Sequence, residues 1–518
     1  MRYVLGIDIG TTGVKALLVS ETGDVTASAS MEYPLLIPRP NWAEQDPETW
    51  WEATVSATRA CLEKARAAVG KGIEVVAVGL SGQMHSSVFL DGRGEVLRPA
   101  ILWCDQRTAP QCREIIDTVG FDRLVELTFN TALAGFTAPK ILWLRQNEPE
   151  VYARVCKVLL PKDYIRYMMA GVFATEVSDA SGTLLFNVAQ RKWSDEMLRA
   201  LDISREWLPD CFESPEISGY ITREAAEALG LTEGTPVAGG GGDQAAGAVG
   251  NGIVRAGLAS CVLGMSGVIF WHSDKPAFDP LARLHSFCHA VPGKWHLMAV
   301  TLTAGGALRW FRDAFCQEEI REAELQGINS YDIIIQKAVG VPTGSEGLVF
   351  LPYLAGERNP HTDANARGAF LGLSLRHTKA HMARAVLEGV AMNLKDCIEL
   401  GRSFGVTATQ IFLSGGGARS AHWQQIAADI FGIEVARTGV DEGPAHGASI
   451  LAAVGAGLFS SVEEACAKLI RTIDSRPPDT ARSQVYRRLY DLYRPLYATL
   501  KDFFDRDANF VEETLEQA

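Results

Sequence analysis

Asp243 is the side chain in this sequence best placed for proton transfer. It follows four glycines, Gly239 to Gly242, and precedes Ala245–Gly250, a run of small residues that predicts a helix. Glycines let the backbone come close to a bound molecule, and a carboxylate about 2.6–3.2 Å from a hydroxyl can accept its proton as a general base. Aspartate is also favoured as a helix N-cap, and the two roles are compatible. The sequence therefore predicts that Asp243 activates a hydroxyl group.

A glycine loop near the N-terminus has the composition of an anion-binding turn. Asp8 stands two residues before Gly10-Thr11-Thr12-Gly13. Amides in glycine-rich turns can point toward an anion, threonine hydroxyls add donors, and magnesium takes one or two carboxylates together with several waters. The pattern predicts a phosphate at this loop and a metal ion held by Asp8 through water. A plain hairpin turn is the structural alternative.

Two further glycine loops follow predicted strands. Gly264–Gly267 could hold the same phosphate chain as the first loop, and Gly415–Ala418 could pack against a nucleobase or ribose. The alternatives are a hairpin turn for the former and tight strand–helix packing for the latter.

A polar pair ends another predicted strand. Gln83 and His85 follow the apolar run Val75–Leu80, and strand ends in α/β sheets are where ligands bind. Their donors and acceptors suit a polyol, and Trp103 could line the same site. A buried structural histidine and a packing tryptophan are the alternatives.

The elements around the first loop exclude two common nucleotide folds. Tyr3–Ile9, Val14–Ser20 and Val25–Ser30 read as three antiparallel strands. A dinucleotide fold needs its glycine turn to open a helix, and a P-loop needs Gly-Lys-Ser/Thr before a helix. Neither is present, so an NAD-linked dehydrogenase is excluded.

The pattern of strand, glycine loop and strand occurs twice. Leu258–Leu263 and Val268–His272 flank the second loop as strands, and helices are predicted over 48–69, 379–404, 420–431, 443–457 and the tail 480–518. The sequence predicts an α/β protein with two related domains, residues 1–252 and 253–518, facing one cleft.

Composition excludes several classes of protein. The net charge of −13 and the lack of a Lys/Arg block argue against nucleic acid as a partner. The ten cysteines have neither disulfide-scaffold nor zinc spacing, no apolar run approaches a membrane span, and strand residues begin at Tyr3. We expect a cytoplasmic protein with no membrane partner.

These residues resemble the FGGY family of carbohydrate kinases. Asp8–Gly13 is similar to the first phosphate loop of the ATPase fold that actin and hexokinase share. Both FGGY signatures are matched, the first by Gly135–Trp143 and the second by Gly368–Leu373 through His381 to Glu388. The resemblance implies two actin/hexokinase-like (ribonuclease H-like) ATPase domains flanking a central cleft, with ATP and Mg²⁺ as cosubstrate and cofactor.

Within the family, the chain is most similar to members that phosphorylate the 5-hydroxyl of D-xylulose. The resemblance implies that Met84 and His85 contact the ketose, that Asp243 is the general base, and that Asp8 lies near the metal and the transferring phosphate. The matching stretches are Trp42–Pro47, Ser81–His85, Leu160–Tyr164 and Gly240–Gly247. The expected substrate-binding residues are Gln83, Met84, His85, Trp103, Asp243 and Gln244. The expected nucleotide-binding residues are Gly10, Thr11, Thr12, Lys15, Ser266, Gly267, Gly305, Gly306, Gly416, Gly417 and Ala418.

Three positions depart from the family pattern. Met265 replaces a threonine and removes one hydroxyl donor, Cys104 replaces an asparagine, and Ser86 replaces a glycine. Ribulose, gluconate and erythritol stay open as alternative substrates, as does an ATP-switched binding protein of the same fold. A homodimer is expected by family analogy.

Overall fold

The computed structural model describes residues 1–70, 72–439 and 443–516. The chain forms two compact units, unit 1 (Met1–Arg255, His272–His296, Glu442–Arg471) and unit 2 (Ala256–Trp271, Leu297–Asp441, Thr472–Ala518). The predicted division into 1–252 and 253–518 stays a prediction, and the segments 272–296 and 442–471 join unit 1. In the described residues, no helix is long and apolar enough to cross a membrane.

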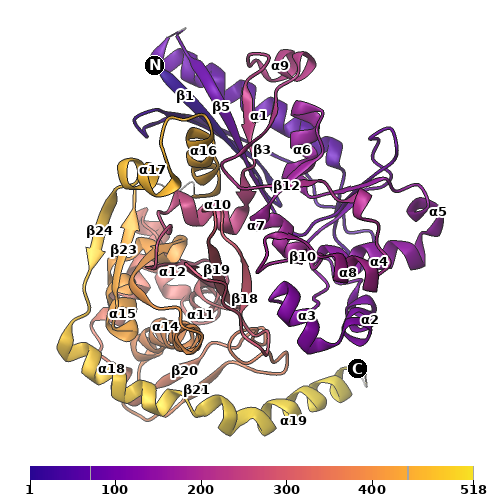
Figure 1. Ribbon diagram of the computed structural model, residues 1–518. Helices are drawn as coiled ribbons and strands as arrows, with labels where there is room; N and C mark the ends of the chain where they lie inside the picture. Colours follow the sequence, from indigo (N-terminus) through magenta and orange to yellow (C-terminus); the bar gives the residue numbers. More distant parts are fainter. Residues whose placement is uncertain (71, 440–442, 517–518) are drawn as a thin grey trace. The chain divides into compact units, whose positions relative to one another are not determined.

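Unit 1 is built on a mixed sheet whose strand ends carry the candidate residues (Figure 1). In spatial order its strands are β13 (Ile217–Tyr220), β14 (Pro236–Ala238), β5 (Glu74–Gly82), β1 (Arg2–Ile9), β2 (Gly13–Ser20) and β3 (Val25–Glu32), with β15 (Gly241–Gly242) also on β5. The meander β1–β2–β3 is antiparallel and β5 is parallel to β1, which confirms the predicted strands. Asp8 lies opposite Ser81 on one side and Lys15 on the other.

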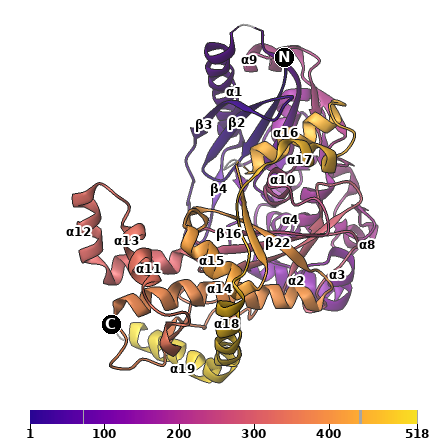
Figure 2. The same cartoon turned by 90° about the vertical axis from the view of Figure 1, so that its left-hand side faces the viewer.

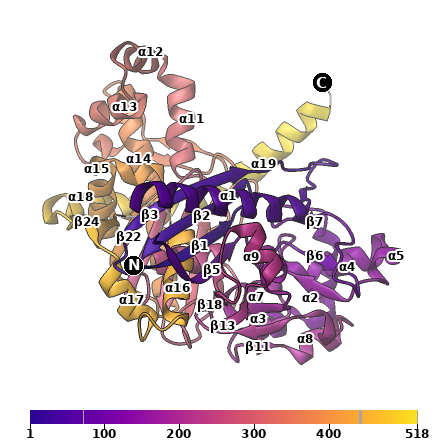
Figure 3. The ribbon, with the colours of Figure 1, turned by 90° about the horizontal axis from the view of Figure 1, so that it is seen from above.

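Helices cover both faces of this sheet. α1 (Pro47–Val69) packs on β2 and β3, and Figure 3 shows it lying along these strands. α16 (Gly443–Gly455) packs on β1 and β5. The approach is so close that a Cβ on Gly6 would lie 2.0 Å from the Ala445 oxygen, and one on Gly79 would lie 1.9 Å from the Ala448 oxygen. Glycine is therefore required on both strands.

α10 (Asp243–Gly250) begins at the candidate base and packs on α16. A Cβ on Gly447 would lie 1.7 Å from the Ala246 oxygen, and one on Gly250 would lie 2.0 Å from the Gly443 oxygen. Because both helices consist of small residues at their contact, α10 is held close to the sheet and the position of Asp243 is fixed.

Unit 2 repeats the topology of unit 1. β16 (Gly257–Leu263) pairs antiparallel with β17 (Gly267–Ser273) and parallel with β22 (Ala408–Ser414), as β1 pairs with β2 and β5. The sheet continues through β23 (Glu434–Thr438) and β24 (Thr472–Arg476), and β19 (Trp295–Thr301) lies beyond β17. The predicted repeat of strand, glycine loop and strand is confirmed.

The long helices of unit 2 meet at the second signature. α18 (Thr480–Tyr493) packs on α15 (Ala421–Phe431) and is hydrogen-bonded to α14 (Lys379–Ser403) through Tyr486 and Tyr490, and Figure 2 shows α19 (Leu496–Glu516) continuing from α18. The buried Glu388 carboxylate accepts hydrogen bonds from Arg384 Nε (2.7 Å), Ser345 Oγ (2.8 Å) and the Tyr486 hydroxyl (2.8 Å). The signature glutamate thus anchors three segments of unit 2.

The other helices and strands complete the two units. In unit 1 they are β4 (Glu44–Gln45), β6 (Val88–Leu90), β7 (Ala100–Ile101), α2 (Ala109–Val119), α3 (Phe121–Thr128), α4 (Thr137–Asn147), α5 (Pro149–Tyr152), β8 (Lys157–Leu159), α6 (Pro161–Ala170), β9 (Ala174–Glu176), α7 (Val177–Ala180), β10 (Phe186–Asn187), β11 (Lys192–Trp193), α8 (Asp195–Ala200), β12 (Asp210–Phe212), α9 (Arg223–Leu229), β18 (His285–Cys288) and α17 (Val462–Leu469). In unit 2 they are α11 (Gly305–Phe315), α12 (Gln317–Gln326), α13 (Ser330–Val339), β20 (Val349–Leu351), β21 (Ala369–Leu371) and α15 (Ala421–Phe431).

Candidate active site

Two carboxyl groups of unit 1 have strongly perturbed acidities. Burial and the negative charge of Asp8 raise the pKa of Asp243 to about 7. Burial raises the pKa of Asp8 to about 6, although the neighbouring Ser81 and Lys15 partly offset this effect. Asp243 Oδ1 accepts the Gln244 amide (2.7 Å), whereas Asp8 Oδ1 is buried and meets no donor in the described residues. A pKa near neutrality suits a group that accepts a proton during turnover.

The first glycine loop turns its carbonyl groups into the protein. The Thr11 oxygen accepts from Gln45 Nε2 (2.7 Å), the Thr12 oxygen accepts from the Tyr33 amide (3.3 Å), and the Gly10 oxygen accepts from the Tyr33 hydroxyl. Within residues 1–70, 72–439 and 443–516, the amides of Thr11 and Thr12 meet no acceptor. The loop therefore offers amide donors to an anion, as its composition predicts.

The side chain of Thr11 is hydrogen-bonded within the protein, and its predicted contact with nucleotide stays a prediction. Its hydroxyl accepts from Trp103 Nε1 (2.9 Å) and donates to Gln83 Oε1 (3.4 Å). Gln83 is buried, and its Nε2 donates to the Gly10 oxygen (3.3 Å) and to Gln45 Oε1 (3.2 Å). Gln83 thus supports the phosphate loop, and its predicted contact with substrate stays a prediction.

His85 is held in an unusual backbone conformation by the first signature. Its φ is 67°, and its carbonyl oxygen accepts from Thr137 Oγ1 (3.1 Å) and Lys140 Nζ (2.8 Å). Its Nδ1 lies 2.8 Å from the Gly182 oxygen. Because a carbonyl oxygen only accepts, Nδ1 carries the hydrogen of this bond. The sequence used this signature only to identify the family and missed its contact with His85.

Two other residues predicted to contact the substrate, Met84 and Gln244, lie beside the glycine run. Met84 is buried and packs so closely on Gly242 that a Cβ there would lie 2.9 Å from Met84 Cγ. Gln244 follows Asp243 in the first turn of α10. Trp103 remains 45% exposed, although its indole nitrogen is hydrogen-bonded. Nearly half of this residue is therefore exposed while its indole nitrogen is occupied.

A buried segment that the sequence did not single out fixes the glycine run. Ser178 Oγ accepts the Gly242 amide (3.1 Å) and donates to Glu176 Oε1 (2.8 Å). Arg166 donates to the Gly239 oxygen. These contacts set the backbone that carries Asp243, and no motif in the sequence marks them.

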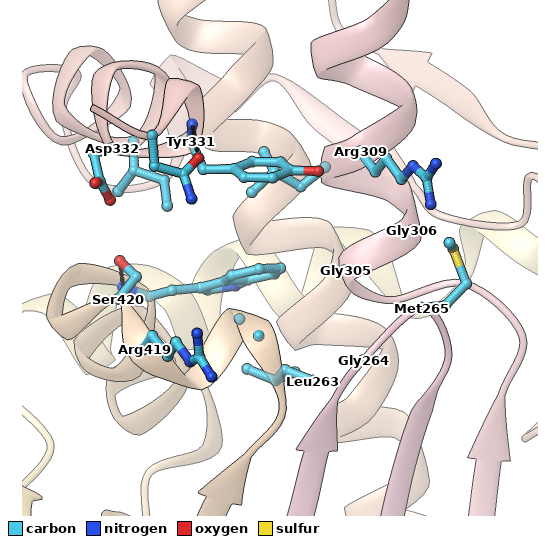
Figure 4. Close-up of a pocket in the computed structure, with 16 residues that line it drawn as sticks. Leu263, Gly264, Met265, Gly305, Gly306, Arg309, Tyr331, Asp332, Arg419 and Ser420 are labelled. Atoms are coloured by element: carbon cyan, nitrogen blue, oxygen red, sulfur yellow. Dashed lines mark hydrogen bonds between the residues drawn. The ribbon is translucent and has the colours of Figure 1, made fainter. Parts of the chain in front are cut away.

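Unit 2 contains a pocket of about 530 Å³ at its own glycine loops (Figure 4). Of the predicted nucleotide-binding residues, Gly305, Gly306, Gly416 and Gly417 line it, together with Leu263, Gly264, Met265, Leu308, Arg309, Asn329, Tyr331, Asp332, Ile335, Arg419, Ser420 and Trp423. Ser266, Gly267 and Ala418 are not among the lining residues. Gly10, Thr11, Thr12 and Lys15 belong to unit 1.

The start of α11 fastens the second glycine loop. The amides of Gly305 and Gly306 donate to the oxygens of Gly264 (2.7 Å) and Met265 (3.1 Å). The Met265 side chain is 59% exposed, and a Cβ on Gly306 would lie 2.6 Å from its sulfur. A thioether has no hydrogen to donate, so this loop lacks a side-chain donor where the family has a hydroxyl.

An aromatic ring that no motif predicted covers one side of the pocket. In Figure 4 the Tyr331 ring projects across the pocket, opposite Arg419 and Ser420. The Arg312 guanidinium carbon lies 4.7 Å from the centroid of the Tyr331 ring, and Asn329 Oδ1 accepts the Tyr331 amide (3.0 Å). The ring is thus positioned to stack on a flat ligand.

Comparisons with known proteins find relatives over nearly the whole chain. Models described as the N-terminal and C-terminal domains of the FGGY family of carbohydrate kinases match residues 3–250 and 259–456. The xylulose kinase of Bacillus subtilis (strain 168) is 39% identical over 97% of this chain and 98% of its own. The xylulose kinase of Escherichia coli (strain K12) is 43% identical over 96% and 99%.

A gluconokinase and a solved structure of a xylulose kinase are also similar to this chain. The gluconokinase of Bacillus subtilis (strain 168) is 32% identical over 98% of both chains. The crystal structure of xylulose kinase from Rhodospirillum rubrum is 33% identical, covers 97% of this chain and 100% of its own, and has a TM-score of 0.89. The two-domain kinase fold expected from the sequence is confirmed.

Proposed function

This chain belongs to the FGGY family of carbohydrate kinases, and we propose that it is a xylulokinase, which transfers the γ-phosphate of ATP to the 5-hydroxyl of D-xylulose. The products are D-xylulose 5-phosphate and ADP. The observation that carries the substrate assignment is the 43% identity to a xylulose kinase over nearly the whole length of both chains.

Asp243 is the general base in this proposal. Its carboxylate accepts the proton of the 5-hydroxyl as the oxygen bonds to the γ-phosphorus and the bond to the ADP oxygen breaks. The pKa of about 7 lets Asp243 be largely ionised in neutral and weakly basic solution while it remains basic enough to accept a proton.

Asp8 is the residue that would hold Mg²⁺ through water. Its buried Oδ1 has no donor in the described part of the chain, and Asp243 is close enough for the Asp8 charge to affect its acidity. One or two carboxylates with several waters are typical of magnesium sites. The bound ion would neutralise charge on the phosphate groups.

The amides of Thr11 and Thr12 would donate to phosphate, with Lys15 in the next strand. The pocket of unit 2 would bind adenosine against Tyr331, Gly416 and Gly417. That one nucleotide is held by both glycine loops stays a prediction, as do a homodimer and a cytoplasmic location.

The sugar-side chemistry favours a neutral ketose over gluconate. The exposed part of Trp103, whose indole nitrogen is already hydrogen-bonded, suits the C–H groups of a polyol. The nearby cations Lys140 and Arg107 are buried, and they are already bonded to carbonyl oxygens and to Asp105. A gluconate carboxylate would therefore have to compete with existing partners.

The test is ADP release by the purified protein with ATP, Mg²⁺ and each of D-xylulose, ribulose, gluconate and erythritol. We expect kcat/KM to be highest for D-xylulose and to fall about 10²- to 10⁴-fold in Asp243→Asn. Preference for gluconate would replace the substrate and retain the kinase mechanism. Full activity of the variant would exclude Asp243 as the base.

A further inference from the structure

We infer that the hydrogen bond from Trp103 to Thr11 couples occupancy of the sugar site to the phosphate loop, so that Trp103 is a positioning residue for ATP as well as a surface for the sugar. The inference rests on the proposed function, because it takes D-xylulose as the ligand at Trp103.

An indole ring has one polar atom, Nε1, which only donates. In Trp103 this atom donates to Thr11 Oγ1 (2.9 Å), inside the loop whose amides face the anion site. A sugar that contacts the exposed part of Trp103 therefore meets carbon atoms, because the N–H group already has an acceptor. Contact with a polyol would bury the 45% of this residue that is exposed and restrict the ring to orientations in which the bond to Thr11 is made.

The bond to Thr11 continues into the support of the loop. Thr11 Oγ1 donates to Gln83 Oε1 (3.4 Å), and Gln83 Nε2 donates to the Gly10 oxygen (3.3 Å). Gln83 also meets Gln45, whose Nε2 donates to the Thr11 oxygen (2.7 Å). The side chain and the backbone of Thr11 are thus held by one connected network, so a shift of the indole acts on the loop directly.

One departure from the family pattern strengthens this network. Ser86, which replaces a common glycine, is buried, and its hydroxyl accepts the Trp103 amide (3.1 Å) and lies 3.4 Å from Gln83 Oε1. A Cβ on Gly135 would lie 2.4 Å from the Trp103 oxygen, so the backbone of Trp103 is closely packed. The main chain of Trp103 is therefore fixed, and the ring is the part left to respond to a ligand.

The experiment is a double-mutant cycle on ligand coupling. The dissociation constant of the nonhydrolysable analogue AMP-PNP with Mg²⁺ is measured by calorimetry with and without saturating D-xylulose, and the ratio of the two values is the coupling factor. Trp103→Phe keeps an aromatic face and removes the donor. Thr11→Val removes the acceptor and keeps the shape, and Thr11→Ser restores a hydroxyl.

We expect D-xylulose to tighten AMP-PNP binding in the wild type. Trp103→Phe and Thr11→Val each lower the coupling factor about two- to tenfold, the range for one neutral hydrogen bond. The double variant shows no further loss, and Thr11→Ser retains coupling. Trp207→Phe, at a half-buried tryptophan that packs on Tyr152, serves as the matched control and leaves the factor unchanged.

Other outcomes overturn the inference. If Trp103→Phe weakens only sugar binding and Thr11→Val has no effect, Trp103 is a stacking surface alone. Losses that add up in the double variant also exclude coupling through this bond. The same holds if the coupling factor of the wild type is one. Failure of the proposed function is a separate observation, namely wild-type protein that phosphorylates no D-xylulose, and it would remove the premise along with the inference.

Discussion

Replacement of Asp243 by asparagine should remove activity and stabilise the ligand-free protein in basic solution. The environment raises the pKa of this carboxyl from 3.8 to about 7, mainly through burial. The folded state therefore binds the proton more tightly than the unfolded state does. The stabilisation by this proton is complete below the unfolded pKa of 3.8 and is lost as pH rises through the folded pKa near 7.

The magnitude follows from linkage. With these two pKa values, ionisation of Asp243 lowers the free energy of unfolding of the wild type by about 2–3 kcal/mol more at pH 8 than at pH 5. The largest loss that the two values allow is about 4 kcal/mol. Asparagine has nearly the same shape and no charge, so the variant escapes this loss. We expect the difference in free energy of unfolding between Asp243→Asn and wild type to grow by about that amount between the two pH values.

The assay is denaturant unfolding of ligand-free protein in EDTA at pH 5 and pH 8, followed by a signal from unit 1. Asp117→Asn, at an exposed position on α2, is the matched control and should show no such growth. In parallel, wild-type kcat/KM should rise with pH through about 7 and then level off, because the ionised base is required. An equal pH dependence in variant and wild type would refute the argument that burial perturbs Asp243.

Three further changes test the support of the site. Met265→Thr restores a hydroxyl donor beside the pocket of unit 2, so the KM for ATP should fall about 3- to 10-fold, and Met265→Val, which has no donor, should not reproduce this. Ser178→Ala removes the acceptor of the Gly242 amide and should lower kcat about tenfold without changing the KM for ATP, whereas Ser178→Thr should recover activity. Gly79→Ala would place a Cβ 1.9 Å from the Ala448 oxygen, so the melting temperature should fall by several degrees, whereas Gly72→Ala, with no atom within 4 Å, should be neutral. An unchanged KM in Met265→Thr, an unchanged kcat in Ser178→Ala or an unchanged melting temperature in Gly79→Ala would contradict the corresponding argument.

The elements could be predicted because their signals are local. The predicted strand Tyr3–Ile9 is followed by a glycine loop and a second predicted strand. The bounds of β1, β2 and β3 in the structure differ from the predicted bounds by at most two residues. Asp243 could be singled out as a candidate because a run of four glycines before a helix is rare and needs a physical reason. The predicted helix over 379–404 is likewise confirmed as α14, because its signals, including the capping residue Thr378, are local in the sequence.

The partners that hold the site could not be predicted, because they come from distant parts of the chain. Thr11 meets Trp103, which is 92 positions away, and Gly242 meets Ser178, which is 64 positions away. Serine and threonine are common residues, so their type alone does not mark Ser178 or Thr11 as part of a site. Tyr331 was missed for the same reason, since an aromatic residue in an amphipathic helix normally reads as core. Only the fold shows that its ring covers a pocket.

Two residues of the first FGGY signature, Thr137 and Lys140, support the backbone of His85. Lys140 is buried, and its ammonium group donates to the oxygens of His85 (2.8 Å) and Gly135 (2.7 Å). Burial lowers the pKa of Lys140 to about 7 despite the nearby Asp105, so the group is retained at a cost in stability. Because His85 has a φ of 67°, which a residue with a side chain rarely adopts, its carbonyl needs firm donors to stay in place. The lysine and the threonine of the signature provide them. Support of the His85 backbone is therefore a structural reason for a threonine and a lysine at this spacing.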